Sequence, residues 1–567
     1  MKLPTTSTLL SLLSLTPLSQ AHLLLLPKIQ LGPDDPFLLR RSTASFTGES
    51  FFPQLISHSS PKQGIFAQKY WYSTEFYTGP GAPVIVFSPG ELAAAPYAEQ
   101  YLTAEKLPGR IAKAVGGAIV VVEHRYYGDS VPLEPLTEEN LQHLTVENAL
   151  RDMQYFARKF EVPFRQNGTA AGNATGLDDG GKKKRGPWVF TGGSYAGALA
   201  GWLSRLEQQE EQEEGKERAF WAYYGSSAVV EGISDFWQYF VPVLEAMPMN
   251  CTKDVERVVE FVDGVLDDGT PEEKDALKQE FGLEDLADDD FAQELSFGMS
   301  QLQMTQFFSE EAYGKSQFYQ FCDYVEGTYP ATVNMTVPGE EGIGVERAVE
   351  GYARWVKEQA IPGFCNISGY AEWKHPNSTL CLQNSNASSL LFTDLEVENW
   401  GNRQWWWLLC NEPFEWWQDT LPFPYPKIVS KRVTSKYDKA MCTRFFPNTT
   451  FNLAEGKTAK DVNFRLGGWD STINVTRTMH TNGEHDPWRD ATLSSKFRPG
   501  GPVTKVEEDG LQVRLVKGGT HCSDLYGGNW ELNDELEKLV EDVVGNMTRW
   551  IGNYYKQEEK AGEKARL

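Results

Sequence analysis

Short apolar runs rich in β-branched residues occur in both halves of the chain and predict the strands of a sheet. Residues 82–87 and 117–123 are almost entirely apolar, which is typical of strands buried on both faces of a parallel sheet. Further strands are predicted at residues 187–190 and 220–225 in the first half of the chain, and at residues 473–481 and 511–517 near its end. Residues 146–160 have helical spacing, and residues 533–555 predict a closing helix. Strands that alternate with helices in this way predict an α/β fold.

The alternation stops after about residue 230, and helical stretches such as 254–266 and 345–359 take its place. A chain of 567 residues is also too long for a single core. We therefore expect a sheet domain that is split by a large, mainly helical insertion. The predicted boundaries are 45–230 for the first part of the sheet domain, 231–460 for the helical insertion, 461–556 for the second part and 557–567 for a polar tail.

The first residues have the pattern of a secretory signal peptide. Lys2 precedes a modest apolar run at residues 9–18, and small residues follow at 19–21, where cleavage is expected. The run is too short to span a bilayer, although an uncleaved anchor remains the alternative. We predict a signal peptide at residues 1–21 and secretion of the protein. A vacuolar or cell-wall location is the alternative.

Glycosylation signals and cysteines agree with secretion. Ten Asn-x-Ser/Thr sequons are present, at Asn167, Asn173, Asn250, Asn334, Asn366, Asn377, Asn386, Asn448, Asn474 and Asn546. Six of the seven cysteines lie between Cys251 and Cys442, which allows up to three disulfides there, and Cys522 is a candidate for the unpaired thiol. No Cys-x-x-Cys pair is present and the eight histidines are scattered, so we expect no zinc site and no other cofactor.

The charge balance argues against two classes of partner. The formal net charge of −25 disfavours binding to nucleic acid or to an anionic membrane. The one basic run, residues 182–185, lies in a polar loop that is predicted to be a surface insertion, with proprotein-type cleavage as a second interpretation.

Residues 188–197 have nearly the pattern of a nucleophile elbow, in which a tight strand-to-helix turn presents a serine above a parallel sheet. The turn needs small neighbours because it brings the backbones of strand and helix together. Gly192, Gly193 and Gly197 meet this demand around Ser194, and Ala196 stands where the strict pattern has glycine. The alternative is an ordinary glycine-rich turn with an incidental serine.

A serine nucleophile needs a histidine base and an acid that orients the histidine, in the chain order Ser, Asp or Glu, His. Four histidines follow Ser194, and only His521 comes after a late strand with a glycine turn; the others are His375, His480 and His485. Asp486 is the best candidate for the acid, since it ends the preceding predicted strand and is followed by proline. Asp490 and Glu484 are rivals, and a plain Asp-Pro turn is the structural alternative.

An oxyanion hole would use the backbone N–H of Tyr195 and a second N–H from the loop that follows the first predicted strand. Gly90 in Ser-Pro-Gly-Glu-Leu is the candidate for the second donor, because a glycine allows the close approach of the backbone. A simple β-turn explains the same residues.

Six segments together resemble the prolyl carboxypeptidase and dipeptidyl peptidase II family of serine peptidases, and most closely its fungal secreted, acid-active, proline-specific endopeptidase branch. They are Phe-Ala-Gln-Lys-Tyr-Trp at 66–71, Glu-His-Arg-Tyr-Tyr-Gly at 123–128, Gly-Gly-Ser-Tyr at 192–195, Trp-Trp-Trp-Leu-Leu-Cys-Asn-Glu at 405–412, Asn-Gly-Glu-His-Asp-Pro-Trp at 482–488 and Gly-Gly-Thr-His-Cys-Ser-Asp-Leu at 518–525.

The resemblance implies an α/β-hydrolase fold with a helical cap, and Ser194, Asp486 and His521 as nucleophile, acid and base. It also implies that Trp488 lines a pocket for proline, and it adds Glu91 and Glu412 as substrate-binding candidates. Core packing is the alternative for Trp488. Two departures are the early loop, where many relatives have Gly-x-Glu-Gly, and Ala196.

The leading hypothesis is a secreted serine peptidase that cleaves on the C-terminal side of proline through an acyl-enzyme, with proline-containing peptides or proteins as its substrates. The alternatives are an esterase or lipase, a dipeptidyl- or carboxypeptidase variant without strict proline preference, and a binding glycoprotein without activity. Which substrate terminus is read, the pH optimum and the oligomeric state stay open at this point.

Overall fold

The computed structural model describes residues 46–163, 185–305, 316–330, 336–452, 454–504 and 506–566. The predicted signal peptide, most of the basic run, and the sequons at Asn167, Asn173 and Asn334 lie outside these ranges. Within them, no helix is both long and apolar enough to cross a membrane.

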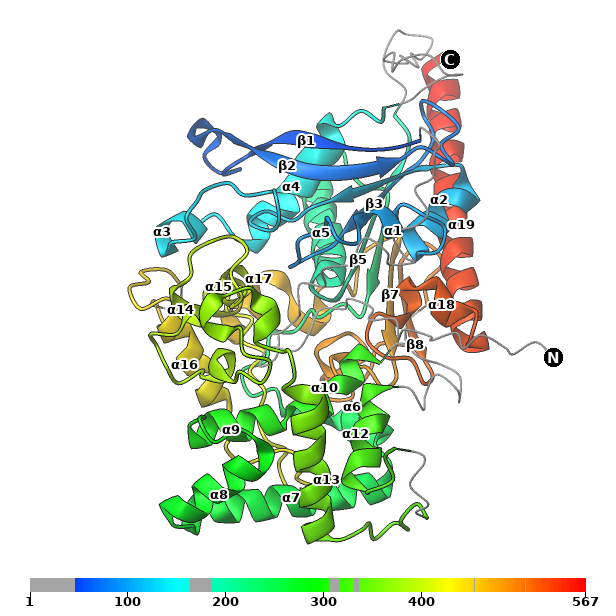
Figure 1. Cartoon of the computed structure of the whole chain (residues 1–567). Helices are drawn as coiled ribbons and strands as arrows, with labels where there is room; N and C mark the ends of the chain where they lie inside the picture. Colours follow the sequence, from blue (N-terminus) through cyan, green and yellow to red (C-terminus); the bar gives the residue numbers. More distant parts are fainter. Residues whose placement is uncertain are drawn as a thin grey trace, which may run out of the picture.

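An eight-stranded sheet forms the centre of the first and last parts of the chain (Figure 1). Its order is β1-β2-β4-β3-β5-β6-β7-β8, and pairing is parallel from β4 through β8 and antiparallel at β1 and β2. The strands are β1 (Thr47–Leu55), β2 (Ile65–Ser73), β3 (Val84–Ser88), β4 (Ala118–Val122), β5 (Trp188–Gly193), β6 (Ala222–Ser226), β7 (Thr478–Gly483) and β8 (Leu511–Val516). Together with the serine at the turn after β5, this is the predicted α/β-hydrolase fold.

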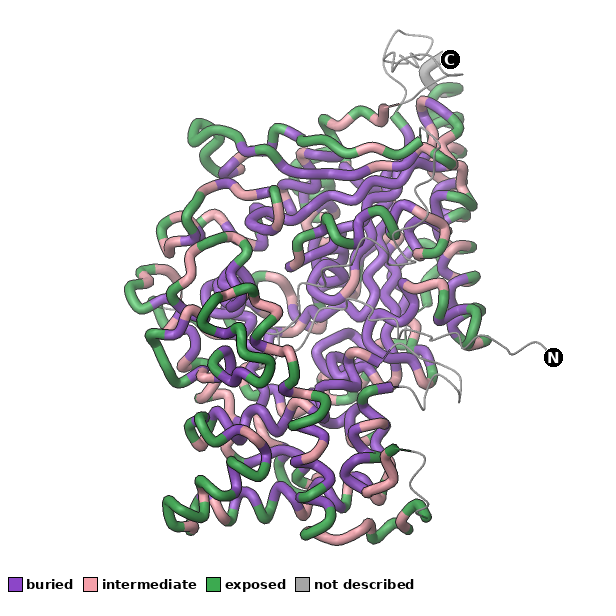
Figure 2. Tube along the Cα trace, in the orientation of Figure 1, coloured by how far each residue is buried: buried purple, intermediate pink, exposed green. Residues whose placement is uncertain are grey.

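Helices cover both faces of the sheet because the apolar strands alternate their side chains between two cores. In β3, Ile85 and Phe87 belong to one core, and Val84 and Val86 belong to the other. The first core includes side chains of α2 and α19, and the second includes side chains of α4 and α5. The central strands of the sheet are buried along their length (Figure 2). The helices of this part are α1 (Ala98–Tyr101), α2 (Leu107–Val115), α3 (Glu138–Leu141), α4 (Val146–Lys159), α5 (Ser194–Glu214), α18 (Gly527–Trp530) and α19 (Asp534–Arg566).

The chain between β6 and β7 is mainly helical and lies beside the sheet, coloured green to yellow in Figure 1. Its helices are α6 (Phe240–Ala246), α7 (Met249–Asp268), α8 (Pro271–Phe281), α9 (Asp288–Leu295), α10 (Phe297–Met304), α12 (Gln317–Val325), α13 (Val345–Trp355), α14 (Leu390–Thr393), α15 (Arg403–Asn411), α16 (Ser435–Phe445) and α17 (Ala459–Leu466). We call this segment the cap. Its buried side chains continue the core on the α4 and α5 face without a break.

Three disulfides link the six cysteines of the cap, Cys251–Cys322, Cys365–Cys381 and Cys410–Cys442. Cys522 is a free, buried thiol. The sequence allowed up to three bridges in this region, and the structure has all three and leaves the candidate Cys522 unpaired.

Three features of the fold differ from the sequence-based expectation. The strand predicted from residue 473 begins only at Thr478, because Arg477 has a φ of +49° and interrupts the extended chain. The antiparallel pair β1 and β2 was not predicted, since its exposed edge strand has no continuous apolar run. The residues predicted as a polar tail continue α19 as a helix as far as Arg566.

Candidate active site

The turn between β5 and α5 is as tight as the elbow pattern requires. Ser194 has a φ of +56°, a conformation that costs energy for any residue with a side chain. A Cβ on Gly192 would lie 2.3 Å from the backbone oxygen of Ala196, and one on Gly197 would lie 2.6 Å from that of Ser226. Glycine is therefore required at both positions by the packing of strand against helix. At Ala196 the structure accommodates the extra methyl group, fully buried.

Asp486 and His521 form a buried hydrogen-bonded pair. The Nδ1 atom of His521 lies 2.8 Å from Oδ1 of Asp486, and neither side chain is exposed. The same carboxylate oxygen accepts the backbone N–H of Trp488 at 2.9 Å. Burial lowers the pKa of His521, but the Asp486 carboxylate and the neighbouring Cys522 together outweigh burial, so that this pKa lies well above its ordinary value.

The two rival acids are engaged elsewhere. Asp490 accepts hydrogen bonds from Arg489 at 2.9 Å and from the backbone of Lys496 at 2.8 Å, and Glu484 accepts the backbone N–H of Gly518 at 2.9 Å. His480 lies within β7 as predicted, where burial lowers its pKa to about 4. His375 is on an exposed part of the cap.

The loop that carries His521 is attached to the ends of the central strands. Asp524 accepts hydrogen bonds from Tyr224, from Ser226 Oγ at 2.6 Å and from Thr481 Oγ1 at 3.1 Å. The backbone N–H of Cys522 donates to Ser227 Oγ at 2.9 Å. These bonds fix the His521 loop above β6 and β7. The sequence analysis missed Asp524, although an acid three residues after a candidate base is a usable signal.

The same loop lies against the elbow. A Cβ on Gly193 would be 3.0 Å from Cys522 Sγ and 2.9 Å from Leu525. The residues next to Ser194 and next to His521 are thus in contact, and Gly193 leaves room for this approach. Ser194, Asp486 and His521 therefore belong to one buried region at the carboxyl ends of the parallel strands.

The loop after β3 packs on the first turn of α5. Gly90 has a φ of +74°, and a Cβ there would lie 3.3 Å from that of Ala196 and 3.6 Å from its backbone nitrogen. Glu91 next to it is buried. Burial raises its pKa to about 7, although a hydrogen bond from its own backbone N–H and positive charge on His521 oppose this rise. The Oε2 atom of Glu91 has no hydrogen-bond partner in the described part of the chain.

The Glu-His-Arg-Tyr-Tyr-Gly segment at residues 123–128 holds the loop after β3 in place through hydrogen bonds. The carboxylate of Glu123 accepts hydrogen bonds from the backbone of Ala94 at 2.8 Å and from Ser130 Oγ at 2.8 Å. Gly128, with a φ of +53°, leaves space for it, since a Cβ there would lie 2.2 Å from Oε1 of Glu123. His124 Nε2 lies 3.3 Å from the hydroxyl of Tyr195. The segment therefore positions the elbow and the loop that faces it.

Aromatic rings, mostly from the cap, build the wall beside His521. The ring of Trp488 lies 6.5 Å from that of His521 and packs against Phe236, Tyr239 and Trp416 at centroid distances of 5.5, 5.7 and 5.7 Å. We call Trp488, Phe236, Tyr239 and Trp416 the aromatic wall. Of these residues, the sequence analysis singled out only Trp488.

Glu412 has protein partners on both carboxylate oxygens. It accepts the backbone N–H of Val146 at the start of α4 and forms an ion pair with Arg465 of α17. The bond with Val146 joins the cap to the sheet domain, and the ion pair with Arg465 lies within the cap. No hydrogen bond of Glu412 that the structure gives reaches Ser194, Asp486 or His521, so substrate binding by Glu412 stays a prediction.

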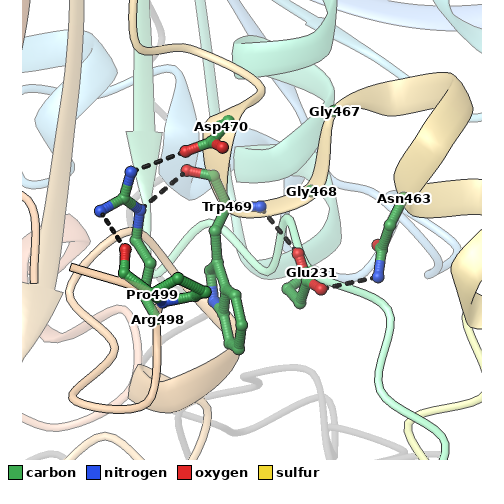
Figure 3. Close-up of a pocket in the computed structure, with 8 residues that line it drawn as sticks. All are labelled: Glu231, Asn463, Gly467, Gly468, Trp469, Asp470, Arg498 and Pro499. Atoms are coloured by element: carbon green, nitrogen blue, oxygen red, sulfur yellow. Dashed lines mark hydrogen bonds and ion pairs between the residues drawn. The ribbon is translucent and has the colours of Figure 1, made fainter. Parts of the chain in front are cut away.

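A separate cavity of about 240 Å³ lies between α17 and the segment after β7 (Figure 3). Its carboxylate, Glu231, accepts hydrogen bonds from Asn463 Nδ2 and from the backbone of Trp469, both at 2.7 Å. Arg498 at its rim pairs with Asp470 at 2.6 Å. None of the three predicted catalytic side chains lines this cavity. It is therefore distinct from the site at the elbow.

The sequons of the described residues differ in exposure. Asn366, Asn377, Asn386, Asn448 and Asn474 are exposed, whereas Asn250 and Asn546 are half-buried. The Asn546 amide already donates to Asp542 and accepts from Gln512 at 3.0 Å. Exposed sequons are the better candidates for glycan attachment.

Comparisons with known proteins agree with this geometry. A family model described as "Serine carboxypeptidase S28" matches residues 57–539. The chain is 35% identical over 528 residues to serine protease vicPb of Bipolaris victoriae (strain FI3), which covers 93% of each chain. It is 28% identical to a probable extracellular serine carboxypeptidase of Arthroderma benhamiae, covering 78% of this chain and 58% of that protein.

Solved structures overlap only weakly. A bacterial brefeldin A esterase covers 90% of this chain and 79% of its own, with 12% identity and a TM-score of 0.32, too low to support an argument. The family match spans most of the chain, and the named relatives are serine proteases and carboxypeptidases. The chain belongs to the S28 family of serine peptidases.

Proposed function

We propose that this protein is a secreted peptidase that cleaves peptide bonds on the C-terminal side of proline, with Ser194, Asp486 and His521 as its catalytic triad. The observation that carries the proposal is the buried 2.8 Å hydrogen bond between His521 and Asp486, on a loop that touches the strained elbow of Ser194. The family assignment favours a peptidase over the esterase alternative.

The reaction begins with attack of Ser194 Oγ on the carbonyl carbon of the proline residue. His521 accepts the serine proton at Nε2, while Asp486 holds Nδ1–H and stabilises the imidazolium that forms. The negative oxygen of the tetrahedral intermediate is bound by the backbone N–H groups of Tyr195 and Gly90. His521 then protonates the leaving amine, which departs and leaves an acyl-enzyme on Ser194.

Water completes the cycle by the same groups. His521 removes a proton from the water as it attacks the acyl carbonyl, and returns that proton to Ser194 Oγ when the second intermediate collapses. The products are a peptide that ends in proline and a peptide with a new amino terminus.

The aromatic wall supports the preference for proline. A flat pyrrolidine ring packs well on aromatic faces, and an apolar surface rejects charged side chains. Trp488 is the central ring of this wall and is linked to Asp486 through its backbone N–H, so proline would be held next to the acid–base pair. Glu91, buried beside His521, is the substrate-binding group that we propose on the opposite loop.

Secretion is supported by the three disulfides and by five exposed sequons in the cap and the segment before β7. One of the relatives is named as extracellular.

Mass spectrometry of the products from one long peptide with internal proline tests the proposal directly. Cleavage after proline is expected, and peptides with blocked and with free ends then distinguish endo-, dipeptidyl- and carboxypeptidase action. Products cut evenly at other residues would refute the proline preference and leave the peptidase assignment intact.

A further inference from the structure

A glutamine of the cap, Gln303, is hydrogen-bonded to two residues of the aromatic wall. Gln303 lies in α10 and is fully buried, and its Oε1 accepts hydrogen bonds from Trp488 Nε1 at 2.9 Å and from the Tyr239 hydroxyl at 3.0 Å. An indole N–H can only donate, so the amide oxygen and not the nitrogen must face Trp488. The orientation of the amide is therefore determined by its neighbours.

The other end of this amide is unused. The Nε2 atom of Gln303 has no acceptor in the described part of the chain, although the side chain is completely buried. A buried N–H group without a partner is unfavourable, and most such groups in proteins find an acceptor. The two N–H donors of this amide are therefore held in a fixed direction, and none of the described residues accepts a hydrogen bond from them.

Gln303 is close to the proposed reaction centre. Two residues later, the backbone oxygen of Thr305 accepts a hydrogen bond from Thr520 Oγ1 at 2.5 Å, and Thr520 directly precedes His521. On its other side, Gln303 holds the ring of Trp488, which lies 6.5 Å from the ring of His521. The Nε2 donors of Gln303 thus belong to the part of the cap that contacts both the aromatic wall and the His521 loop.

We propose that Gln303 binds the peptide backbone of the substrate, with Nε2 donating a hydrogen bond to the carbonyl oxygen of the residue that precedes proline. This inference rests on the proposed function. Proline has no backbone N–H, so the carbonyl before it is the polar group that a donor beside a bound proline ring can use. Gln303 then has two roles at once: its oxygen positions Trp488 against the ring, and its nitrogen fixes the adjoining peptide bond.

The test compares a peptide with an ester that lacks this carbonyl. Benzyloxycarbonyl-Gly-Pro-p-nitroanilide is the peptide, and p-nitrophenyl acetate is the ester, with hydrolysis by Ser194→Ala subtracted as background. Gln303→Met removes the donors. The ratio of kcat/KM for peptide to that for ester should fall about 10- to 100-fold, mainly through KM, because a bond present in ground and transition states alike changes KM.

Gln303→Glu keeps an oxygen that accepts the hydrogen bonds from Trp488 and Tyr239. Donation to the substrate carbonyl then depends on whether the new carboxyl group is protonated. The neutral carboxyl can still donate, whereas the ionised form cannot and repels a carbonyl oxygen. We expect a new descending limb with rising pH in kcat/KM for the peptide, absent for the ester. Gln301→Glu is the matched control in the same helix, since Gln301 Nε2 donates to the backbone oxygen of Phe297 at 3.2 Å. It should add no such limb.

A substrate change gives a readout that does not depend on what fraction of the variant folds, because KM does not depend on the concentration of active enzyme. Replacing the carbonyl oxygen before proline by sulfur weakens the acceptor, so KM of the unaltered enzyme should rise more than KM of Gln303→Met. Equal losses on peptide and ester, or equal sensitivity to sulfur in both proteins, would overturn the inference. If the unaltered enzyme does not cleave the proline peptide at all, the proposed function fails instead.

Discussion

On the side of the sheet, the residues around Ser194 are held by hydrogen bonds and close backbone contacts, whereas on the side of the cap the substrate wall is held mainly by ring packing. Asp524 and Glu123 each receive at least three hydrogen bonds from neighbouring strands and loops. Trp488, in contrast, has three aromatic neighbours of the wall and one side-chain hydrogen bond.

This difference separates two properties of the site. Hydrogen bonds are directional and set the position of a reacting atom, while ring packing is adaptable and sets which side chain fits. Substitutions on the sheet side should therefore lower the rate for every substrate. Those on the cap side should change the choice of substrate.

Replacing the proposed nucleophile should have the largest effect on activity, and this effect should come from the sheet side of the site alone. Ser194→Ala is expected to lower turnover of a proline-containing chromogenic peptide by about 10⁶, because the attacking atom is lost. The thermal unfolding midpoint should not fall, since alanine adds no strain at a φ of +56° beyond that of serine. Activity within tenfold of the original in a purified sample would contradict the triad.

Removing the charge of the acid should have the next largest effect. Asp486→Asn is expected to lower kcat for peptide and ester alike by about 10⁴, since the imidazole loses the group that orients it. Asp490→Asn is the matched control, because Asp490 pairs with Arg489 and not with His521. Equal losses of kcat in the two variants would show that Asp486 is not the acid that orients His521.

Truncating the central ring of the aromatic wall should act on the cap side. Trp488→Ala is expected to lower the peptide-to-ester ratio of kcat/KM roughly 10- to 100-fold, because the proline ring loses its packing surface. Unfolding by denaturant should also become easier, by about 3–5 kcal/mol, since the indole is buried. A ratio that stays constant while stability falls would identify Trp488 as core packing only, the alternative that its sequence context left open.

The pH dependence of activity should give the smallest effect, and it tests the protonation of His521 on the sheet side. His521 must be neutral to accept the serine proton, and its pKa lies well above the ordinary value because of Asp486. Peptidase activity should therefore fall as pH decreases through that raised value, with a midpoint above about 6.5. Measurement of kcat/KM for the unaltered enzyme between pH 4 and 9 checks this, because kcat/KM reports the protonation of the free enzyme. Full activity at pH 4 would contradict a raised pKa of His521.

Much of the sheet and of the proposed site was predictable from local pattern. The buried parallel strands were found within a few residues, because burial on both faces leaves continuous apolar runs. Ser194, Asp486 and His521 stand next to glycine turns at strand ends, which local sequence reveals. The β1–β2 pair escaped since an exposed edge strand has no such run, and the start of β7 was misplaced because Arg477 leaves the extended region.

The cap side could not be predicted in the same way. Gln303, Phe236 and Tyr239 have no motif of their own, and they meet Trp488 only because α10 and the segment before α6 fold back onto the loop after β7. The fold class, the cysteine-rich insertion and the residue types for acyl transfer can be read from the amino-acid pattern, since they depend on short-range periodicity and spacing. Which carboxylate faces His521, and which amide nitrogen beside Trp488 has no acceptor among the described residues, follows from the packing of the elements, because these hydrogen bonds join residues far apart in the chain.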